Sequence, residues 1–222
     1  MQDVGFVIIP GPIPVDGLAR LSAAYDDAVQ HADPADVGDG RTTIRVHDFV
    51  NRGPEFDPIY VHPPVLDACA LVINEAFKLS SLLARTVRPR SAAQDLHVDF
   101  APNASGWPML GFILMVDAFR SDNGATRFVP GSHRVTARLD DVRDLTADRD
   151  DQLLACEPAG SMIVYNGSIW HGHTANVSDT PRRSLQGAYV RRSAPSSVDR
   201  PARMRPETLA RLGPIARDVL AL

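Results

Sequence analysis

The sequence contains few cysteines and no long apolar run, and each shortage excludes a class of protein. Two cysteines among 222 residues do not make a disulfide framework, and both lie in apolar stretches where cysteine usually behaves as a small hydrophobic residue. No apolar run approaches the roughly 18 residues that a membrane span requires. The N-terminus shows no basic segment leading into an apolar stretch with a cleavage site. We therefore expect a cytoplasmic protein without a structural disulfide and without a membrane partner.

Positive charge is not concentrated anywhere along the chain. Lysine and arginine number 23, aspartate and glutamate number 27, and the formal net charge is −4. Lys78 is the single lysine, and the arginines are spread through the sequence. Proteins that bind nucleic acids need a basic stripe or patch, so we do not expect a nucleic acid as a partner.

The pattern of apolar residues predicts a mixed α and β flank followed by an all-β core. In the first third, residues 4–9 and 42–50 look extended, whereas residues 15–30 and 65–79 have helical spacing. After residue 80 the chain consists of short extended runs separated by turn signals. These runs are residues 81–87, 96–100, 109–119, 125–129, 152–156, 161–165 and 183–191.

Many short strands joined by tight turns favour a sandwich or a jelly-roll barrel. A chain of 222 residues fits one domain. We therefore predict a single domain, mainly β with flanking helices. Its parts are an N-terminal flank over residues 1–80, a jelly-roll core over 81–192 and a tail over 193–222, with one tail helix at 206–212.

The triplet His97-Val98-Asp99 is the first motif that carries chemistry. Residues i and i+2 of a strand project from the same face, so an extended segment at 96–100 would aim both polar side chains into the barrel. Leu96 and Val98 would then pack on the other side. The similar triplet at His31 lies in a polar loop where no strand fixes its side chains, and we interpret it as a chance occurrence.

A third metal ligand would have to come from a distant strand. The buried run at 161–165 leads to Trp170-His171-Gly172-His173, where two histidines compete for the role. The alternative is that both belong to a surface turn and bind nothing. Two imidazoles and one carboxylate leave open positions on a metal, and non-haem Fe(II) oxygenases use this ligand set.

Three segments together resemble the phytanoyl-CoA dioxygenase family of Fe(II) and 2-oxoglutarate-dependent oxygenases. They are residues 94–99, residues 123–134 with the sequence Asn-Gly-Ala-Thr-Arg-Phe-Val-Pro-Gly-Ser-His-Arg, and residues 171–183. The segments occur in family order, and their combination is far more specific than any one of them. Residues 5–10 also look like the start of the family's fold.

The resemblance implies a double-stranded β-helix, the cupin-like jelly roll, in which His97, Asp99 and His171 hold iron. It also implies that Arg182, eleven residues after the distal histidine, binds the far carboxylate of 2-oxoglutarate. A guanidinium is a rigid, charged, bidentate partner for a carboxylate, which agrees with that role. The alternative is a surface arginine in a Pro-Arg-Arg turn.

Four further residues receive weaker assignments, of which His173 and Ile113 are departures from the family pattern. His173 stands where several relatives carry a small hydroxyl residue, and it could contact the cosubstrate, face the substrate or cap the turn. Ile113 replaces an aromatic residue of some relatives and would supply apolar packing to the cosubstrate. Gln94 could orient a ligand through a hydrogen bond or simply start a strand. Arg85 could point into the barrel toward substrate or cosubstrate, or lie on its rim.

The implied activity uses Fe(II), 2-oxoglutarate and O2 to hydroxylate a C–H bond, with release of succinate and carbon dioxide. Asp99, in place of a small residue, argues against a halogenase. The chain shows no basic patch for the phosphates of coenzyme A, so we expect a small metabolite as substrate, contacted by the N-terminal third and by residues 101–107 and 134–151. Two alternatives are a cupin-like metal enzyme that does not use 2-oxoglutarate and a barrel that binds a small ligand without catalysis.

Overall fold

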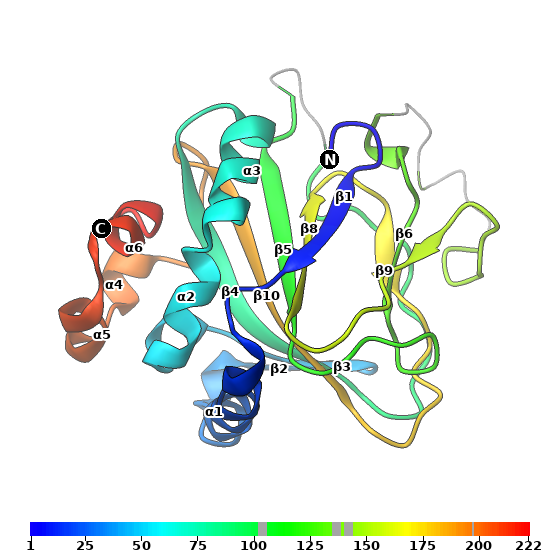
Figure 1. Cartoon of the computed structure of the whole chain (residues 1–222), viewed down its shortest axis with the longest axis horizontal. Coiled ribbons are helices and arrows are strands. Elements are labelled where there is room, and N and C mark those ends of the chain that lie inside the picture. The colour runs from blue at the N-terminus through cyan, green and yellow to red at the C-terminus, as the bar shows by residue number, and fades with distance from the viewer. Residues whose placement is uncertain (102–105, 135–138, 140–143, 197) are drawn as a thin grey trace.

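The computed structural model describes residues 1–101, 106–134, 139, 144–196 and 198–222. Its centre is a pair of sheets in which every described strand pairing is antiparallel (Figure 1). The major sheet has the order β1-β8-β5-β10-β4-β3-β2, and the minor sheet has the order β7-β6-β9. This arrangement confirms the predicted jelly roll with flanking helices.

The strands are β1 (Phe6–Pro10), β2 (Val37–Asp39), β3 (Thr43–Val46), β4 (Phe77–Val87), β5 (Met109–Met115), β6 (Thr126–Phe128), β7 (Leu153–Leu154), β8 (Ser161–Asn166), β9 (His171–His173) and β10 (Arg182–Arg191). The α-helices are α1 (Leu18–Gln30), α2 (Asp57–Tyr60), α3 (Pro63–Ile73), α4 (Arg200–Arg203), α5 (Pro206–Arg211) and α6 (Pro214–Val219). Short 3-10 turns lie at Val15–Gly17, Pro34–Asp36, Phe49–Asn51, Pro54–Phe56 and Ser132–Arg134.

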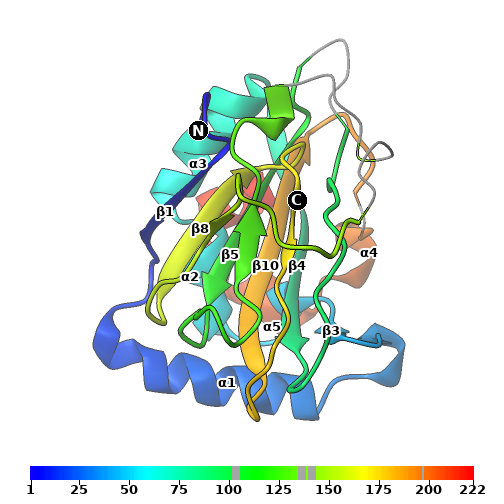
Figure 2. The same cartoon turned by 90° about the vertical axis from the view of Figure 1, so that its right-hand side faces the viewer.

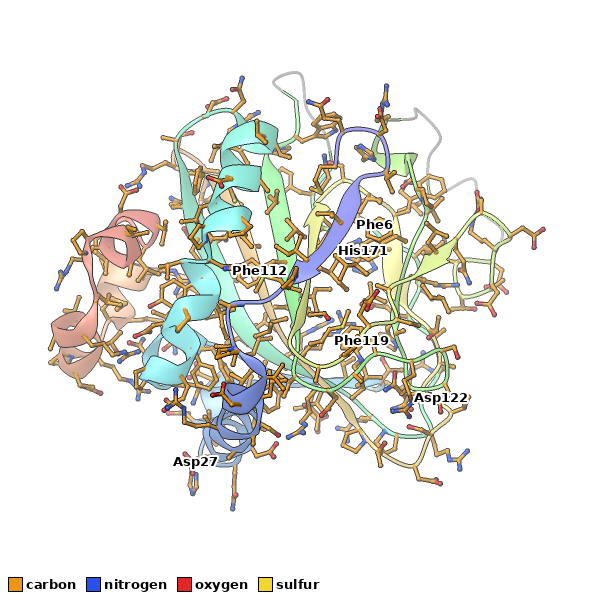
Figure 3. All side chains as sticks on the ribbon, viewed as in Figure 1. Phe6, Asp27, Phe112, Phe119, Asp122 and His171 are labelled. Atoms are coloured by element: carbon orange, nitrogen blue, oxygen red, sulfur yellow. The ribbon has the colours of Figure 1, made fainter. Side chains whose placement is uncertain are left out.

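The major sheet is buried on both faces because helices cover one face and the minor sheet covers the other. Every residue of β5 is buried, as a central strand between two layers requires. Leu110, Phe112 and Leu114 belong to the outer apolar cluster with the helices, whereas Ile113 and Met115 belong to the inner cluster. Figure 3 shows Phe112 on the helix side and His171 between the sheets. Successive side chains of β5 therefore point alternately toward the helices and toward the space between the two sheets, where His171 lies.

The first predicted flank also contributes strands to the major sheet. Strand β1 pairs with β8 along its whole length, and β3 pairs with β4. Figure 2 shows β8, β5, β10 and β4 side by side, with α1 crossing below them. The single-domain division at residues 80 and 192 stays a prediction, but the boundary at 80 does not separate the N-terminal strands from the core.

One segment, Pro54–Ile73, is long and apolar enough to cross a membrane by length and composition alone. In the structure it is broken into a 3-10 turn, α2 and α3. Val65, Cys69 and Ile73 of α3 are buried in the outer cluster. This is the packing of a core helix, and the absence of a membrane partner stays a prediction.

The predicted strand at residues 96–100 is wrong in its extent. His97 alone forms an isolated β-bridge, to His171 of β9. Beyond it the backbone leaves the sheet, because the amides of Asp99 and Phe100 both donate to the carbonyl of Gly167. Leu96 and Val98 nevertheless pack together against Trp170, as predicted for the face opposite the candidate ligands.

Three further predictions from sequence need correction. The helix expected at 65–79 ends at Ile73, because Asn74 adopts a left-handed conformation with φ 53° and β4 begins at Phe77.

Cys156 is exposed and not buried, whereas Cys69 is buried as expected, and both are free thiols. The tail contains three short helices where one was predicted. The loops expected at 101–107 and 134–151 lie partly outside the described residues.

Gly187 marks a point where β10 and β5 leave no room for a side chain. A Cβ atom at this position would lie 2.1 Å from the ring of Phe112. We expect Gly187→Ala to lower the free energy of unfolding by roughly 1–3 kcal/mol through overpacking. Thermal unfolding followed by circular dichroism measures the change. Gly38→Ala is the control, since its Cβ would meet no atom nearer than 3.9 Å, and equal melting temperatures for both variants would contradict the prediction.

Candidate metal centre and adjoining cavities

The structure brings His97, Asp99 and His171 together at one point. One ligand atom from each residue lies within 4.8 Å of the other two. Nε2 of His97 is 3.7 Å from Oδ1 of Asp99, and Nε2 of His171 is 3.5 Å from Oδ2. The β-bridge between the two histidines holds their rings 4.4 Å apart, centre to centre. The three side chains could therefore hold a single metal ion.

Backbone carbonyls fix the tautomers of both histidines. Nδ1 of His97 lies 3.0 Å from the carbonyl oxygen of Asp95, and Nδ1 of His171 lies 2.9 Å from that of Ile169. Because a carbonyl oxygen only accepts, each Nδ1 carries the proton and donates it. Each Nε2 then presents its lone pair toward Asp99, which is the form in which imidazole binds a metal.

The electrostatics of the three residues also suit a cation. Burial, and then the neighbouring His171, lower the pKa of His97 to about 4, so this ring is neutral near pH 7. Burial alone would raise the pKa of Asp99, but His171, a hydrogen bond from Tyr165 and His97 outweigh it and lower the pKa. The site therefore offers a neutral His97 imidazole and an ionised Asp99 carboxylate to a cation.

Tyr165 is a member of the site that the sequence analysis did not identify. Its hydroxyl donates to Oδ2 of Asp99 over 2.6 Å. Burial, and then the charge of Asp99, raise the pKa of Tyr165 well above its usual value, so the phenol stays a donor. The available signal was strand alternation, since Tyr165 lies on the same face of β8 as Ile163, toward the inner cluster.

We expect Tyr165→Phe to weaken metal binding about tenfold without unfolding the protein. The variant removes the donor that orients Asp99, and loss of such outer contacts typically lowers metal affinity 10- to 100-fold. Titration of Zn(II) against a competing chelator measures the dissociation constant. Tyr189→Phe is a matched control, because the Tyr189 hydroxyl bonds to the carbonyl of Tyr60, in the outer apolar core. Equal zinc affinities for the two variants would refute the role of Tyr165.

A small cavity of about 40 Å³ adjoins the candidate ligands and contains the other predicted site residues. Its walls are Arg85, Gln94, Asp99, Ile113, Thr126, Tyr165, His171, Gly172, His173, Arg182 and Gln186. All the residues that the sequence analysis singled out line it except His97, which lines a larger neighbouring cavity. Thr126 and Gln186 were not anticipated, and only the inward register of β6 and β10 could have indicated them.

Arg182 is a buried cation in this cavity. Its residue is 1% exposed, and its guanidinium donates to the carbonyl of Gly124 and to Oγ of Ser184. The ring of Phe119 lies 4.0 Å from the guanidinium carbon, and Nε has no hydrogen-bond partner. Among the described residues no carboxylate forms an ion pair with it. The alternative that Arg182 is a surface arginine in a turn is therefore wrong. The neighbouring Arg183 instead forms ion pairs with Asp26 and Asp117.

Arg85 also points into the barrel and not onto its rim. One guanidinium nitrogen donates to the side-chain oxygen of Gln94 over 2.6 Å, and Nε has no partner. Gln94 thus contacts Arg85 rather than a candidate metal ligand. Burial, followed by repulsion from Arg85, lowers the pKa of Arg182 to about 9. Two guanidinium groups thus line this cavity, and Asp99 is the one acidic side chain among its described lining residues, so the local charge favours an anion.

His173 and Ile113 complete the walls of the small cavity. Nδ1 of His173 lies 2.8 Å from the carbonyl oxygen of Thr174, and burial lowers the pKa of His173 to about 3. This histidine is therefore neutral and separate from the group of three candidate ligands. Ile113 is 2% exposed and contributes an apolar surface to the cavity, and its packing against a cosubstrate stays a prediction.

The large cavity has a volume of about 500 Å³ and also adjoins the candidate metal site, because His97 and Asp99 line it. It shares Arg85, Asp99, Tyr165 and Gln186 with the small cavity. Its apolar lining comes mainly from Leu83, Phe100, Met109, Ala188 and Val190. A cavity of this size accommodates a small organic molecule.

Comparisons with known proteins agree with this architecture. A solved epimerase, SnoN, from nogalamycin biosynthesis, in complex with Fe3+, alpha ketoglutarate and nogalamycin RO, superposes with a TM-score of 0.71 at 19% identity, covering 92% of this chain and 88% of that one. HygX from Streptomyces hygroscopicus, with nickel, 2-oxoglutarate and hygromycin B bound, gives 0.72 at 15% identity, covering 88% and 86%. Both similarities establish the fold.

Sequence comparison establishes the family. Dioxygenase af480 of Aspergillus fumigatus is 30% identical over 182 residues, which cover 76% of this chain but only 57% of that protein. The chain thus spans little more than half the length of this curated relative. The family described as phytanoyl-CoA dioxygenase matches residues 1–184. The chain belongs to the phytanoyl-CoA dioxygenase family.

Proposed function

We propose that this protein is a non-haem Fe(II) and 2-oxoglutarate-dependent dioxygenase that hydroxylates a C–H bond of a small metabolite. The observation that carries the proposal is the small cavity, because it joins the candidate metal ligands to Arg182. A dicarboxylic acid bound here would contact the metal at one end and the guanidinium of Arg182 at the other. Membership of a dioxygenase family supports the same assignment.

The residues present fit both groups. Two imidazoles and a carboxylate on one side of a metal are the ligand set of Fe(II) oxygenases that keep open positions. The buried guanidinium of Arg182, with its unpartnered Nε, fits a carboxylate in a charge-assisted, fork-like contact. When bound, Fe(II), 2-oxoglutarate and O2 together supply the oxidation of a C–H bond, with release of succinate and carbon dioxide.

The contribution of the chain is positioning, charge and exclusion of water. The carbonyls of Asp95 and Ile169 orient the histidine rings, and Tyr165 orients Asp99. Arg182 fixes the far end of the cosubstrate, while Ile113 keeps its middle in an apolar environment. The large cavity places a second molecule beside the same metal site. Such preorganisation lowers the barrier because the reacting groups need little rearrangement.

The substrate assignment rests on size and on the solved relatives. The large cavity has about 500 Å³, which suits a small metabolite, and its described lining contains no lysine. The solved structures of SnoN and HygX contain nogalamycin RO and hygromycin B. By analogy, a small natural product is the proposed partner of this chain, in the cytoplasm and without nucleic acid or membrane.

An anaerobic titration with Fe(II) and 2-oxoglutarate tests the proposal directly. Chelation of the metal by 2-oxoglutarate should give a metal-to-ligand charge-transfer band, and addition of O2 should then release succinate slowly even without substrate. A metal-free sample is the control. A cupin-like enzyme without cosubstrate predicts metal binding but no band, and a non-catalytic barrel predicts no succinate above the control.

A further inference from the structure

The large cavity carries more positive than negative charge. Arg45 and Arg85 line it, and Asp99 is the one acidic side chain among its described lining residues. Arg45 of β3 lies directly opposite Arg85 of β4, so both side chains project from the inner face of the sheet. The like charge of Arg45 also contributes, after burial, to the lowering of the pKa of Arg85 to about 10.

Arg45 differs from most arginines of this chain in having no anionic partner. It is exposed at the mouth of the cavity, and in the described ranges no hydrogen bond or ion pair engages its guanidinium. By contrast, Arg88, Arg183 and Arg211 each form an ion pair with an aspartate. An unpaired guanidinium at the entrance of a binding cavity is available to a ligand.

The proposed cosubstrate does not neutralise these charges. The two carboxylates of 2-oxoglutarate balance the two charges of Fe(II), and Asp99 balances one of the three guanidinium groups of Arg45, Arg85 and Arg182. Two positive charges then stay without a counterion near the metal. The buried guanidinium groups of Arg85 and Arg182 repel one another more strongly than charges in water do, so an additional anion is stabilised near them.

On the proposed function, we infer that the substrate is an organic anion whose carboxylate, or similar acidic group, binds Arg45 at the outer end of the large cavity. Its apolar body lies against Leu83, Met109 and Val190, and a C–H bond then faces Asp99 and His97. A cationic substrate such as an amine is disfavoured, since the described lining offers it no carboxylate other than Asp99.

Three probes with the same apolar body test this inference: 3-phenylpropanoate, 3-phenylpropanamide and 3-phenylpropylamine. Calorimetric titration into the protein loaded anaerobically with Fe(II) and 2-oxoglutarate gives their dissociation constants. We expect the carboxylate to bind about tenfold more tightly than the neutral amide, because a guanidinium contact is charge-assisted. The ammonium probe should bind most weakly.

Variants of exposed arginines identify the residue responsible. In Arg45→Gln the preference for the carboxylate over the amide should fall to less than about threefold, and Arg45→Lys should restore part of it. Arg41→Gln is the matched control, since Arg41 is also exposed and does not line the cavity. It should leave the preference unchanged.

The outcomes separate this inference from the proposed function. Equal binding of the three probes, no binding of the carboxylate, or a preference that survives in Arg45→Gln would overturn the inference. Loss of the charge-transfer band on adding 3-phenylpropanoate would also overturn it, because the probe would then have displaced 2-oxoglutarate. Absence of the band in the wild-type protein before any probe is added would instead refute the proposed function.

Discussion

His97→Ala is expected to abolish succinate formation and to weaken Fe(II) binding by at least about a hundredfold. A site of three protein ligands loses one of them, and each ligand of a metal site contributes on the order of 3 kcal/mol to binding. The side chain is only partly buried, with 32% of its surface exposed, so the fold should tolerate the change. Anaerobic metal titration and a succinate assay measure the two effects.

His31→Ala is the matched control for this prediction. His31 belongs to the other His-x-Asp triplet, lies on the surface and contacts Asp27. The two motifs are alike in sequence, but only His97 lies beside a second histidine. If His31→Ala lost iron as well, or if His97→Ala kept full turnover, the candidate metal centre would be assigned to the wrong residues.

Arg182→Met is expected to raise the dissociation constant of 2-oxoglutarate at least thirtyfold while leaving Fe(II) affinity nearly unchanged. Removing one partner of a buried, hydrogen-bonded charge pair typically costs about 2–5 kcal/mol. The amplitude of the charge-transfer band as a function of 2-oxoglutarate concentration measures the effect. Arg182→Lys should be intermediate, because lysine keeps the charge and loses the planar fork.

Arg183 provides the control at the adjacent position. Its side chain is paired with Asp26 and Asp117, and it lines neither of the two cavities beside the metal site. Arg183→Gln should therefore lower the melting temperature and leave 2-oxoglutarate binding intact. A cosubstrate affinity that is equal in Arg182→Met and in the wild-type protein would refute the role of Arg182 as the anchor of the far carboxylate.

The sequence allowed prediction of the site better than of the secondary structure around it. The family resemblance identified His97, Asp99, His171 and Arg182, whereas the residues alone left His171 and His173 as alternatives. The structure places all four identified residues around adjoining cavities. The strand expected at 96–100 was wrong because a tertiary hydrogen bond from Asp99 to Gly167 overrides local extension. The secondary-structure preferences of residues 96–100 carry no information about such a tertiary contact.

The residues that were missed are those whose role depends on a distant partner. Tyr165 looks like an ordinary buried strand residue until Asp99 is placed 2.6 Å from its hydroxyl. Arg45 looks like one of many scattered arginines until the pairing of β3 with β4 puts it opposite Arg85. In both cases the information lies in strand register, which the sequence pattern of single strands does not specify.

The four residues shared by the two cavities also have a kinetic consequence. The walls of the small cavity include the deeply buried His173 and Arg182, whereas the large cavity reaches the exposed Arg45. On the proposed function, a molecule in the large cavity lies against Asp99 and Tyr165, which also line the small cavity. We therefore expect 2-oxoglutarate to bind before the substrate.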